Sequence, residues 1–531
     1  MIADSLSISA ESLLLGQLLF PFAAAVAIPV GFSSPRRCSA VTQCGLWLMG
    51  ILSVSLVAHC LGDAVTGSPL RVTESITIEW TLWGSGSESA LFDRIVMRMD
   101  ATRAALLALM PWTALTVLSL LGPNVTRSQC VATWLLMGAT GVFLLAGDIA
   151  SLMIGWSLMI GVLSWWVAWF GSEGKRDSAK RLLGIQVVSL GVFAAGLAVM
   201  CGIDAIVQGA PDGPPGVTST VWTELPAIRE ALFETHPAAP VLWRAYHTLP
   251  AALLLIGTWL AAGLFPVAVW TYDRNLLGRS PGRAWMIVLL PIVLIQLWLI
   301  LVELDPLFEQ ETRGILSWFV VVGATIAGAR MAIASDPEER TLAGFAWLRH
   351  LVVLALLGLP GEMWDTKRVP LLVSLIAAGA LWGLLLPGNS ALSGTSGTGR
   401  RLFAAAWAIL LYAVGMLPGL TGMVLLWAAT HPRGLAGQPG GEFLLFLLLI
   451  ANCLATWGTL QAVLQKFDTE SGESRSSSPH EEGVLARPEF GPLSTAPSVE
   501  PSSSMTRTQA ILCIFWMTLP PAMAVALAGL W

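Results

Sequence analysis

The chain has 531 residues, of which 55% are hydrophobic and only 12% are charged, whereas an average soluble protein carries about 25% charged residues. Its net charge of -5 excludes a nucleic-acid-binding protein, because that function needs clustered basic residues. The seven cysteines form no CxxC motif and no cluster with histidine, so neither a zinc site nor an iron–sulfur site is indicated. Since phosphate-binding loops, haem-attachment motifs and nucleophile elbows are also absent, we expect this chain to bind no cofactor.

Long apolar runs predict an all-α integral membrane protein that crosses the bilayer many times. A helix needs about 20 apolar residues to cross a hydrocarbon core about 30 Å thick. Backbone N–H and C=O groups without hydrogen-bond partners are too costly to place in lipid. The runs are continuous and not alternating, which favours helices over a barrel. We expect about 14 helices, at residues 12–32, 40–61, 101–121, 131–147, 149–170, 182–203, 248–271, 283–302, 314–334, 341–359, 369–387, 402–429, 443–464 and 509–530.

The distribution of Lys and Arg predicts the orientation of these helices. Cytoplasmic loops are enriched in basic residues, and with both termini outside, more than half of the 29 basic residues fall in inside loops. Residues 1–10 contain no Lys or Arg, so they lack the charged start of a secretory signal and we expect the first helix to be retained. The predicted location is a bacterial plasma membrane, with the N-terminus and the C-terminus outside.

Three long loops interrupt the helices. Residues 62–98 contain apolar residues in alternation from Ile76 to Leu82, which predicts a short external hairpin. Residues 204–247 mix Pro and Gly around a short helix. Residues 467–507 are rich in Ser, Pro and Glu and are typical of a disordered linker. We therefore divide the chain into an N-terminal part (1–100), a core (101–430) and a C-terminal part (431–531).

Few ionisable side chains fall inside the predicted spans, and each is a candidate for function because burial of a charge in the membrane is costly. Asp148, at a junction of two helices, is either a cap for the next helix or part of an ion path. Arg330 either reaches the inside surface or acts internally. Arg349 and His350 are adjacent in one helix and point about 100° apart, so at most one can face lipid comfortably. They form either a structural pair or a proton relay.

One segment resembles a known family. Within residues 147–182, Asp148, then Gly155 and Trp156, and then Lys180 stand at places that match the antiporter-like membrane subunits of respiratory complex I (NADH-quinone oxidoreductase chains L, M and N, or chain 5). That family has an Asp before an apolar stretch, a Gly-Trp-Glu, and an Ala-x-Lys-Ala-Phe segment at the start of the next helix.

Three further segments are similar to the same family and occur in its order. Pro266, Trp270, Asp273, Gly278 and Pro281 resemble Pro-x-x-x-Trp-x-x-Asp followed by Gly-Pro-Thr-Pro, with one residue inserted. Residues 336–343 (DPEERTLA), which contain Arg340, resemble Asp-x-Lys-Arg-x-Leu-Ala, also with an insertion, and residues 415–423 (GMLPGLTGM), which contain Pro418, resemble Gly-x-Pro-Pro-Leu-x-Gly-Phe. The four segments together span about residues 100–430.

The resemblance implies an antiporter-like fold with inverted repeats of discontinuous helices. It also implies a membrane-arm subunit that couples electron transport to proton translocation, with membrane and redox subunits and the lipid bilayer as partners. The expected helix breaks lie at Pro266 and Pro418. The candidates for an ion path or for coupling are Asp148, Ser157, Lys180, Asp273, Arg330, Arg340, Arg349 and His350.

The chain departs from the family at the residues that carry charge. The family's Glu after Gly-Trp is Ser157, its Lys before the Pro is Ala261, its next His aligns with Ile287, and its late Lys aligns near Leu426. Ser, Ala, Ile and Leu cannot bind and release protons, so impaired conduction is expected. The alternatives are a membrane subunit of a cation/proton antiporter, a membrane subunit of an inorganic-carbon transport complex, and a structural paralogue that does not conduct.

Overall fold

A computed structural model gives the structure of the chain. It describes residues 10–32, 34–65, 76–81, 94–121, 125–169, 175–208, 247–266, 282–304, 306–358, 372–373, 375–377, 379–380, 440–473, 511–512 and 514–516.

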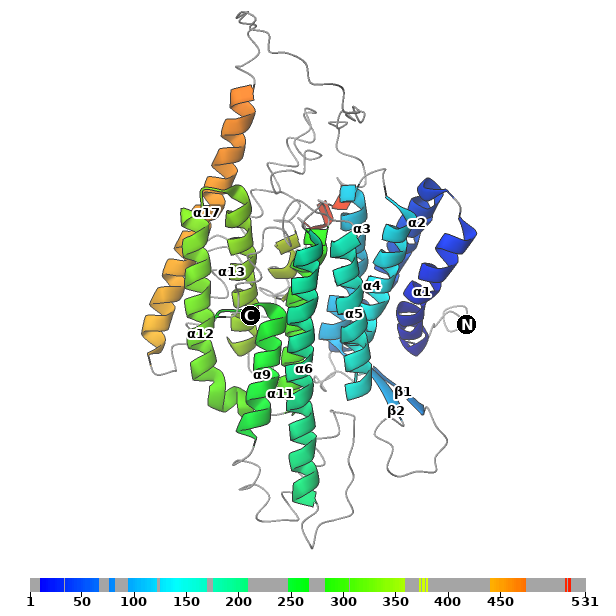
Figure 1. Ribbon diagram of the computed structural model, residues 1–531, viewed down its shortest axis with the longest axis horizontal. Helices are drawn as coiled ribbons and strands as arrows, with labels where there is room; N and C mark the ends of the chain where they lie inside the picture. Colours follow the sequence, from blue (N-terminus) through cyan, green and yellow to red (C-terminus); the bar gives the residue numbers. More distant parts are fainter. Residues whose placement is uncertain are drawn as a thin grey trace, which may run out of the picture.

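The described part is a bundle of long helices with one small sheet (Figure 1). Antiparallel strands β1 (Ile76–Thr81) and β2 (Arg94–Met99) pair between α2 and α3. The helices are α1 (Ala10–Gly31), α2 (Pro35–Val65), α3 (Ala101–Leu121), α4 (Arg127–Leu145), α5 (Ile149–Trp169), α6 (Lys175–Gln208), α9 (Thr248–Ala262), α11 (Gly282–Leu304), α12 (Pro306–Ile333), α13 (Pro337–Gly358) and α17 (Gly441–Glu473).

The helical membrane protein that the apolar runs predict is confirmed. Ten described helices are long and apolar enough to cross a membrane, and together with the shorter α9 they coincide with eleven of the expected spans. Of the expected spans 369–387 and 509–530, only short pieces are described, and those are helical. The expected span 402–429 lies outside the described residues.

Three helices form the centre of the bundle. In α3, α11 and α13 the buried share of the spanning segment is 89%, 94% and 100%, whereas it is 33% in α2 and α6. The peripheral helices present their apolar faces outward, as expected of surfaces that meet lipid. The centre is therefore the place to look for polar groups held away from both lipid and water.

The strand pair and the projecting end of α17 lie at opposite ends of the bundle (Figure 1). The strand β2 contacts the junction of α4 and α5, through a bridge between Met97 and Ala146, and lies at one end of the bundle (Figure 1). At the opposite end, α17 projects beyond the other helices. The predicted hairpin is confirmed, in the register that pairs Ile76 with Met99 and Ile78 with Met97. Its placement outside the cell stays a prediction.

Two element boundaries differ from those expected. Helix α17 continues to Glu473, so residues 467–473 of the predicted disordered linker are helical, and residues 474–507 lie outside the described part. Helix α9 ends at Ala262 and not at residue 271, because the chain turns into a left-handed conformation at Gly263. The division of the chain at residues 100 and 430 stays a prediction.

Candidate functional site at the end of helix α9

Helix α9 is too short to cross a membrane. Its 15 residues extend about 22 Å at 1.5 Å per residue, whereas a hydrocarbon core is about 30 Å thick. The residues at its end are nevertheless buried, with Ala262 and Leu264 both 0% exposed. The last four carbonyl groups of a helix have no partner within the helix, so α9 must find partners for them inside the protein.

The turn after α9 supplies two of those partners. Gly263 adopts a φ of 61°, a conformation that glycine reaches without the strain a Cβ atom would cause. The Gly263 N–H then donates to the carbonyl of Leu260 at 3.3 Å, and the Leu264 N–H donates to the carbonyl of Trp259 at 3.2 Å. This pair of bonds is the Schellman arrangement that ends many helices.

Side chains from two neighbouring helices satisfy the other two carbonyls. Gln186 of α6 donates from Nε2 to the carbonyl of Ala261 at 2.9 Å. Arg349 of α13 donates from its guanidinium group to the carbonyl of Ala262 at 2.8 Å. All four terminal carbonyls of α9 are therefore hydrogen-bonded, and a cation stands at the negative end of the helix dipole.

Beyond the turn, the backbone of Phe265 makes two more contacts with side chains. Its carbonyl accepts a 2.9 Å hydrogen bond from the indole N–H of Trp259. Its N–H donates to Nε2 of His350 at 3.3 Å, and Nδ1 of the same ring lies 2.6 Å from the carbonyl of Ala346. The peptide bond between Phe265 and Pro266 is cis. Arg349 and His350 thus contact the same helix end with different chemistry.

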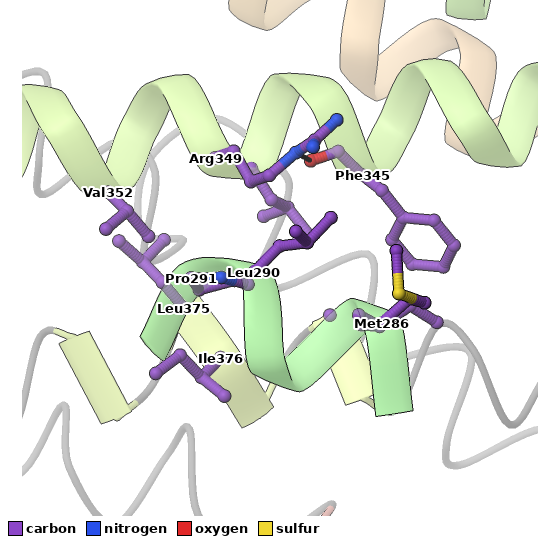
Figure 2. A pocket seen from close by; sticks show the side chains of 11 residues that line it. Met286, Leu290, Pro291, Phe345, Arg349, Val352, Leu375 and Ile376 are labelled. Atoms are coloured by element: carbon purple, nitrogen blue, oxygen red, sulfur yellow. Dashed lines mark hydrogen bonds between the residues drawn. The ribbon is translucent and has the colours of Figure 1, made fainter. Parts of the chain in front are cut away.

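A small cavity lies on the other side of Arg349, between α13 and α11. Figure 2 shows Arg349 and Val352 on α13 facing Leu290 and Pro291 on α11 across it. Its volume is about 20 Å³, which is room for about one water molecule. Among the described residues that line it, Arg349 is the only charged one. The others are Met286, Ile287, Leu290, Pro291, Phe345, Leu348, Val352, Leu375, Ile376 and Gly379.

Ile287, which lines this cavity, occupies the position at which the resemblance would lead us to expect a histidine. A water molecule needs two to four polar partners to occupy a cavity stably, and this lining offers mainly apolar side chains. The site therefore places the buried charge of Arg349 beside a mainly apolar cavity. Such an arrangement holds a fixed charge inside the bundle but provides no chain of proton-binding groups among the described residues that line the cavity.

The other positions at which the chain departs from the family lie apart in the fold. Ala261 is 0% exposed at the end of α9, whereas Ser157 is exposed on the outer face of α5. A carboxylate at position 157 would therefore be accessible from lipid or from a neighbouring subunit. Lys180, the residue that matches the family's Lys on the next helix, has a 78% exposed side chain and pairs with Asp177 at 3.4 Å. This ion pair belongs to the surface of α6.

Arg330 and Arg340 lie together at the end of the bundle opposite the strands. The guanidinium of Arg340 is buried and donates to the carbonyls of Met331 and Ala334 at the end of α12, and to Oε1 of Gln461 on α17. Arg330 is 44% exposed and lies 3.4 Å from Glu339. Arg340 therefore joins the start of α13 to the end of α12 and to the middle of α17, and Arg330 reaches the surface of the bundle.

Asp148 acts as a cap for α5, the first of its two interpretations. Its Oδ1 accepts a 2.8 Å hydrogen bond from the backbone N–H of Ser151, the third residue of α5. Its Oδ2 accepts 2.8 Å bonds from the hydroxyl of Ser151 and from the N–H of Val96 in β2. The side chain is fully buried. It therefore joins the start of α5 to the strand pair.

A third buried arginine, Arg103 of α3, was not among the residues predicted from the sequence. Its side chain is 0% exposed and pairs with Asp100 and with Glu303 of α11, the latter at 3.4 Å. Its Nε donates to Oε1 of Gln296 at 3.2 Å, and Nε2 of Gln296 donates to the carbonyl of Phe143 at 3.3 Å. The spacing of Asp100 and Arg103 at the start of an apolar run was the available signal.

The remaining predicted positions lie outside the described residues. They are Trp270, Asp273, Gly278 and Pro281 in the second matching segment, Pro418 in the fourth, and Leu426.

Chains of similar fold occur in solved structures of membrane complexes. No family model and no curated protein matches the sequence. Among solved structures, a chain of the Mrp complex from Dietzia sp. DQ12-45-1b is similar with a TM-score of 0.68 at 13% identity, and the match covers 98% of this chain and 95% of that chain.

Two respiratory complexes contain similar chains. One is the membrane-bound sulfane sulfur reductase, an archaeal respiratory membrane complex, with a TM-score of 0.66 at 13% identity over 98% of this chain and 95% of that chain. The other is respiratory complex I from Thermus thermophilus, with a TM-score of 0.61 at 14% identity over 97% of this chain and 99% of that chain. This chain is therefore an integral membrane protein with the antiporter-like fold of the membrane subunits in these complexes.

Proposed function

We propose that this chain is a membrane subunit of a multi-subunit complex that couples electron transport to proton translocation, and that its own central site conducts protons poorly. The likeness in fold to chains of two respiratory complexes supports the first part. The observation that carries the second part is the end of α9, where the charge of Arg349 meets the negative end of the helix and Ile287 lines a mainly apolar cavity. The bacterial plasma membrane and outside termini belong to the same proposal.

A fixed cation fits this role better than a relay does. An arginine side chain cannot give up its proton in a protein, so Arg349 cannot pass protons along a path. It can raise the electrostatic barrier to any second cation near the end of α9, because charges interact strongly where water is excluded. A subunit of this kind transmits or resists a conformational change, and its partner subunits carry most of the ion flux.

The second candidate is a membrane subunit of a cation/proton antiporter. The likeness to a chain of the Mrp complex favours it. In both readings the chain works with partner subunits, and what differs is whether those partners carry redox groups.

Purification of the tagged full-length chain from its native membrane in mild detergent, followed by mass spectrometry, tests the proposal. Recovery of flavin-binding and iron–sulfur subunits in fixed stoichiometry is the expected result. Recovery of transporter subunits alone would select the antiporter reading. Recovery of the chain by itself, in more than one detergent and after cross-linking in the membrane, would contradict assembly into either kind of complex and leave a structural paralogue.

A further inference from the structure

His350 is placed to connect the protonation of a side chain to the conformation of the chain after α9. Its ring is 2% exposed and touches the backbone of Phe265, which lies 85 residues earlier in the sequence. This contact is the hydrogen bond from the Phe265 N–H to Nε2 of His350. It comes immediately after the four satisfied carbonyls of α9, at the point where the chain leaves the helix.

The two partners of the ring define its protonation state. A carbonyl oxygen only accepts hydrogen bonds, so Nδ1, which lies 2.6 Å from the carbonyl of Ala346, carries a proton. A backbone N–H only donates, so Nε2, which lies 3.3 Å from the nitrogen of Phe265, is unprotonated. The contact with Phe265 therefore exists only while His350 is neutral.

The surroundings leave the ring little room to adjust. A Cβ atom at Gly323 of α12 would lie 2.3 Å from Nε2, so glycine at this position is what allows the ring to lie against α12. Of the segments that touch the ring, the one after α9 contributes the backbone of Phe265, and α12 contributes Gly323. In the described part of the chain, Arg349 of α13 is the charged group that acts on it. A proton on Nε2 thus faces a backbone N–H and a neighbouring cation.

We infer that His350 is a proton-binding site whose occupation releases the segment after α9. A proton taken from water binds Nε2, the Phe265 N–H loses its acceptor, and two N–H groups then oppose each other. Residues 264–266 move away from α13, and loss of the proton to water restores the contact. This inference rests on the proposed function. The end of α9 then responds to a bound proton by changing its conformation, and it does not conduct protons.

Hydrogen exchange measured by mass spectrometry on the full-length chain in lipid nanodiscs tests this inference. The peptide that covers residues 259–266 is followed between about pH 4 and about pH 8, a range that covers histidine titration. The control is His350→Gln, because glutamine keeps a donor and an acceptor but takes up no proton. Comparison at each pH cancels the intrinsic pH dependence of exchange.

The expected result is equal exchange in parent and His350→Gln at about pH 8, and exchange at least about tenfold faster in the parent at about pH 4. An unchanged ratio across the whole range would overturn the inference. Gly323→Ala provides a second variant, because its added Cβ displaces the ring. We expect fast exchange at both pH values in this variant, and parent-like exchange at about pH 8 would also overturn the inference. Neither result depends on which subunits co-purify, so failure here is distinct from failure of the proposed function.

Discussion

The guanidinium group of Arg349 donates a 2.8 Å hydrogen bond to the carbonyl of Ala262, which is the last residue of α9. This contact joins two segments that are 87 residues apart. It brings a permanent positive charge to the negative end of a helix that stops inside the bundle. The same helix end also accepts a hydrogen bond from Gln186, so side chains of both α6 and α13 hold the end of α9.

We expect loss of the hydrogen bond from Gln186 to destabilise the end of α9. In Gln186→Leu the carbonyl of Ala261 loses its donor, and we expect the free energy of unfolding to fall by about 1 kcal/mol, which is the order measured for hydrogen bonds between membrane helices. The control is Val187→Ala, which alters an exposed position of the same helix. Thermal unfolding in detergent compares the two. Equal loss in both variants would mean that the bond from Gln186 contributes nothing.

We expect a Gly→Ala substitution to have opposite effects on stability at two glycines of α5, Gly155 and Gly161. A Cβ at Gly155 would lie 2.5 Å from the backbone nitrogen of Phe143, whereas nothing lies within 4 Å of a Cβ at Gly161. Gly155→Ala forces α4 and α5 apart and lowers stability by about 2 kcal/mol. Gly161→Ala leaves stability unchanged or raises it by up to about 1 kcal/mol, since alanine favours a helix. Thermal unfolding of both variants in detergent tests this prediction. A Gly155→Ala variant with the stability of the parent would contradict it.

Loss of the cap on α5 also frees the strand pair. In Asp148→Ala the N–H groups of Ser151 and Val96 lose their acceptors, and we expect a loss of about 1–2 kcal/mol. Hydrogen exchange in residues 94–99 should rise with it. The matched control is Ser151→Ala, which removes one hydroxyl and leaves both backbone bonds. If exchange in β2 is the same in both variants, Asp148 does not hold the strand.

We expect the buried ion pairs of Arg103 to contribute more to stability than the exposed ion pair of Lys180. Arg103→Gln leaves Asp100 and Glu303 without their buried cation and should cost about 3–5 kcal/mol. Lys180→Gln breaks a pair exposed to solvent and should change stability by less than about 0.5 kcal/mol. Both are measured by unfolding in the same detergent. A small effect of Arg103→Gln would show that its network is dispensable.

The sequence predicts the helices and the hairpin well but not the contacts of the site. Apolar runs mark spans such as α11 without ambiguity, and alternation from Ile76 marks β1. Gly263, three residues before Pro266, was an available signal for the early end of α9. The partners of that end could not be predicted, because Gln186 and Arg349 meet it only through tertiary packing. Burial of Arg103 likewise depends on the approach of α11.

The proposed function requires that the neutral and apolar residues at the end of α9 and around its cavity limit proton flux through the chain. The direct measurement is pH-driven proton flux into vesicles that contain the full-length chain with its co-purified partners. The parent is compared with Ile287→His, which places a proton-binding group in the cavity that Arg349 also lines. We expect slow flux in the parent and an increase of at least about tenfold in the variant, a factor that corresponds to about 1.4 kcal/mol of barrier. Equal flux in the parent and the variant would contradict this claim.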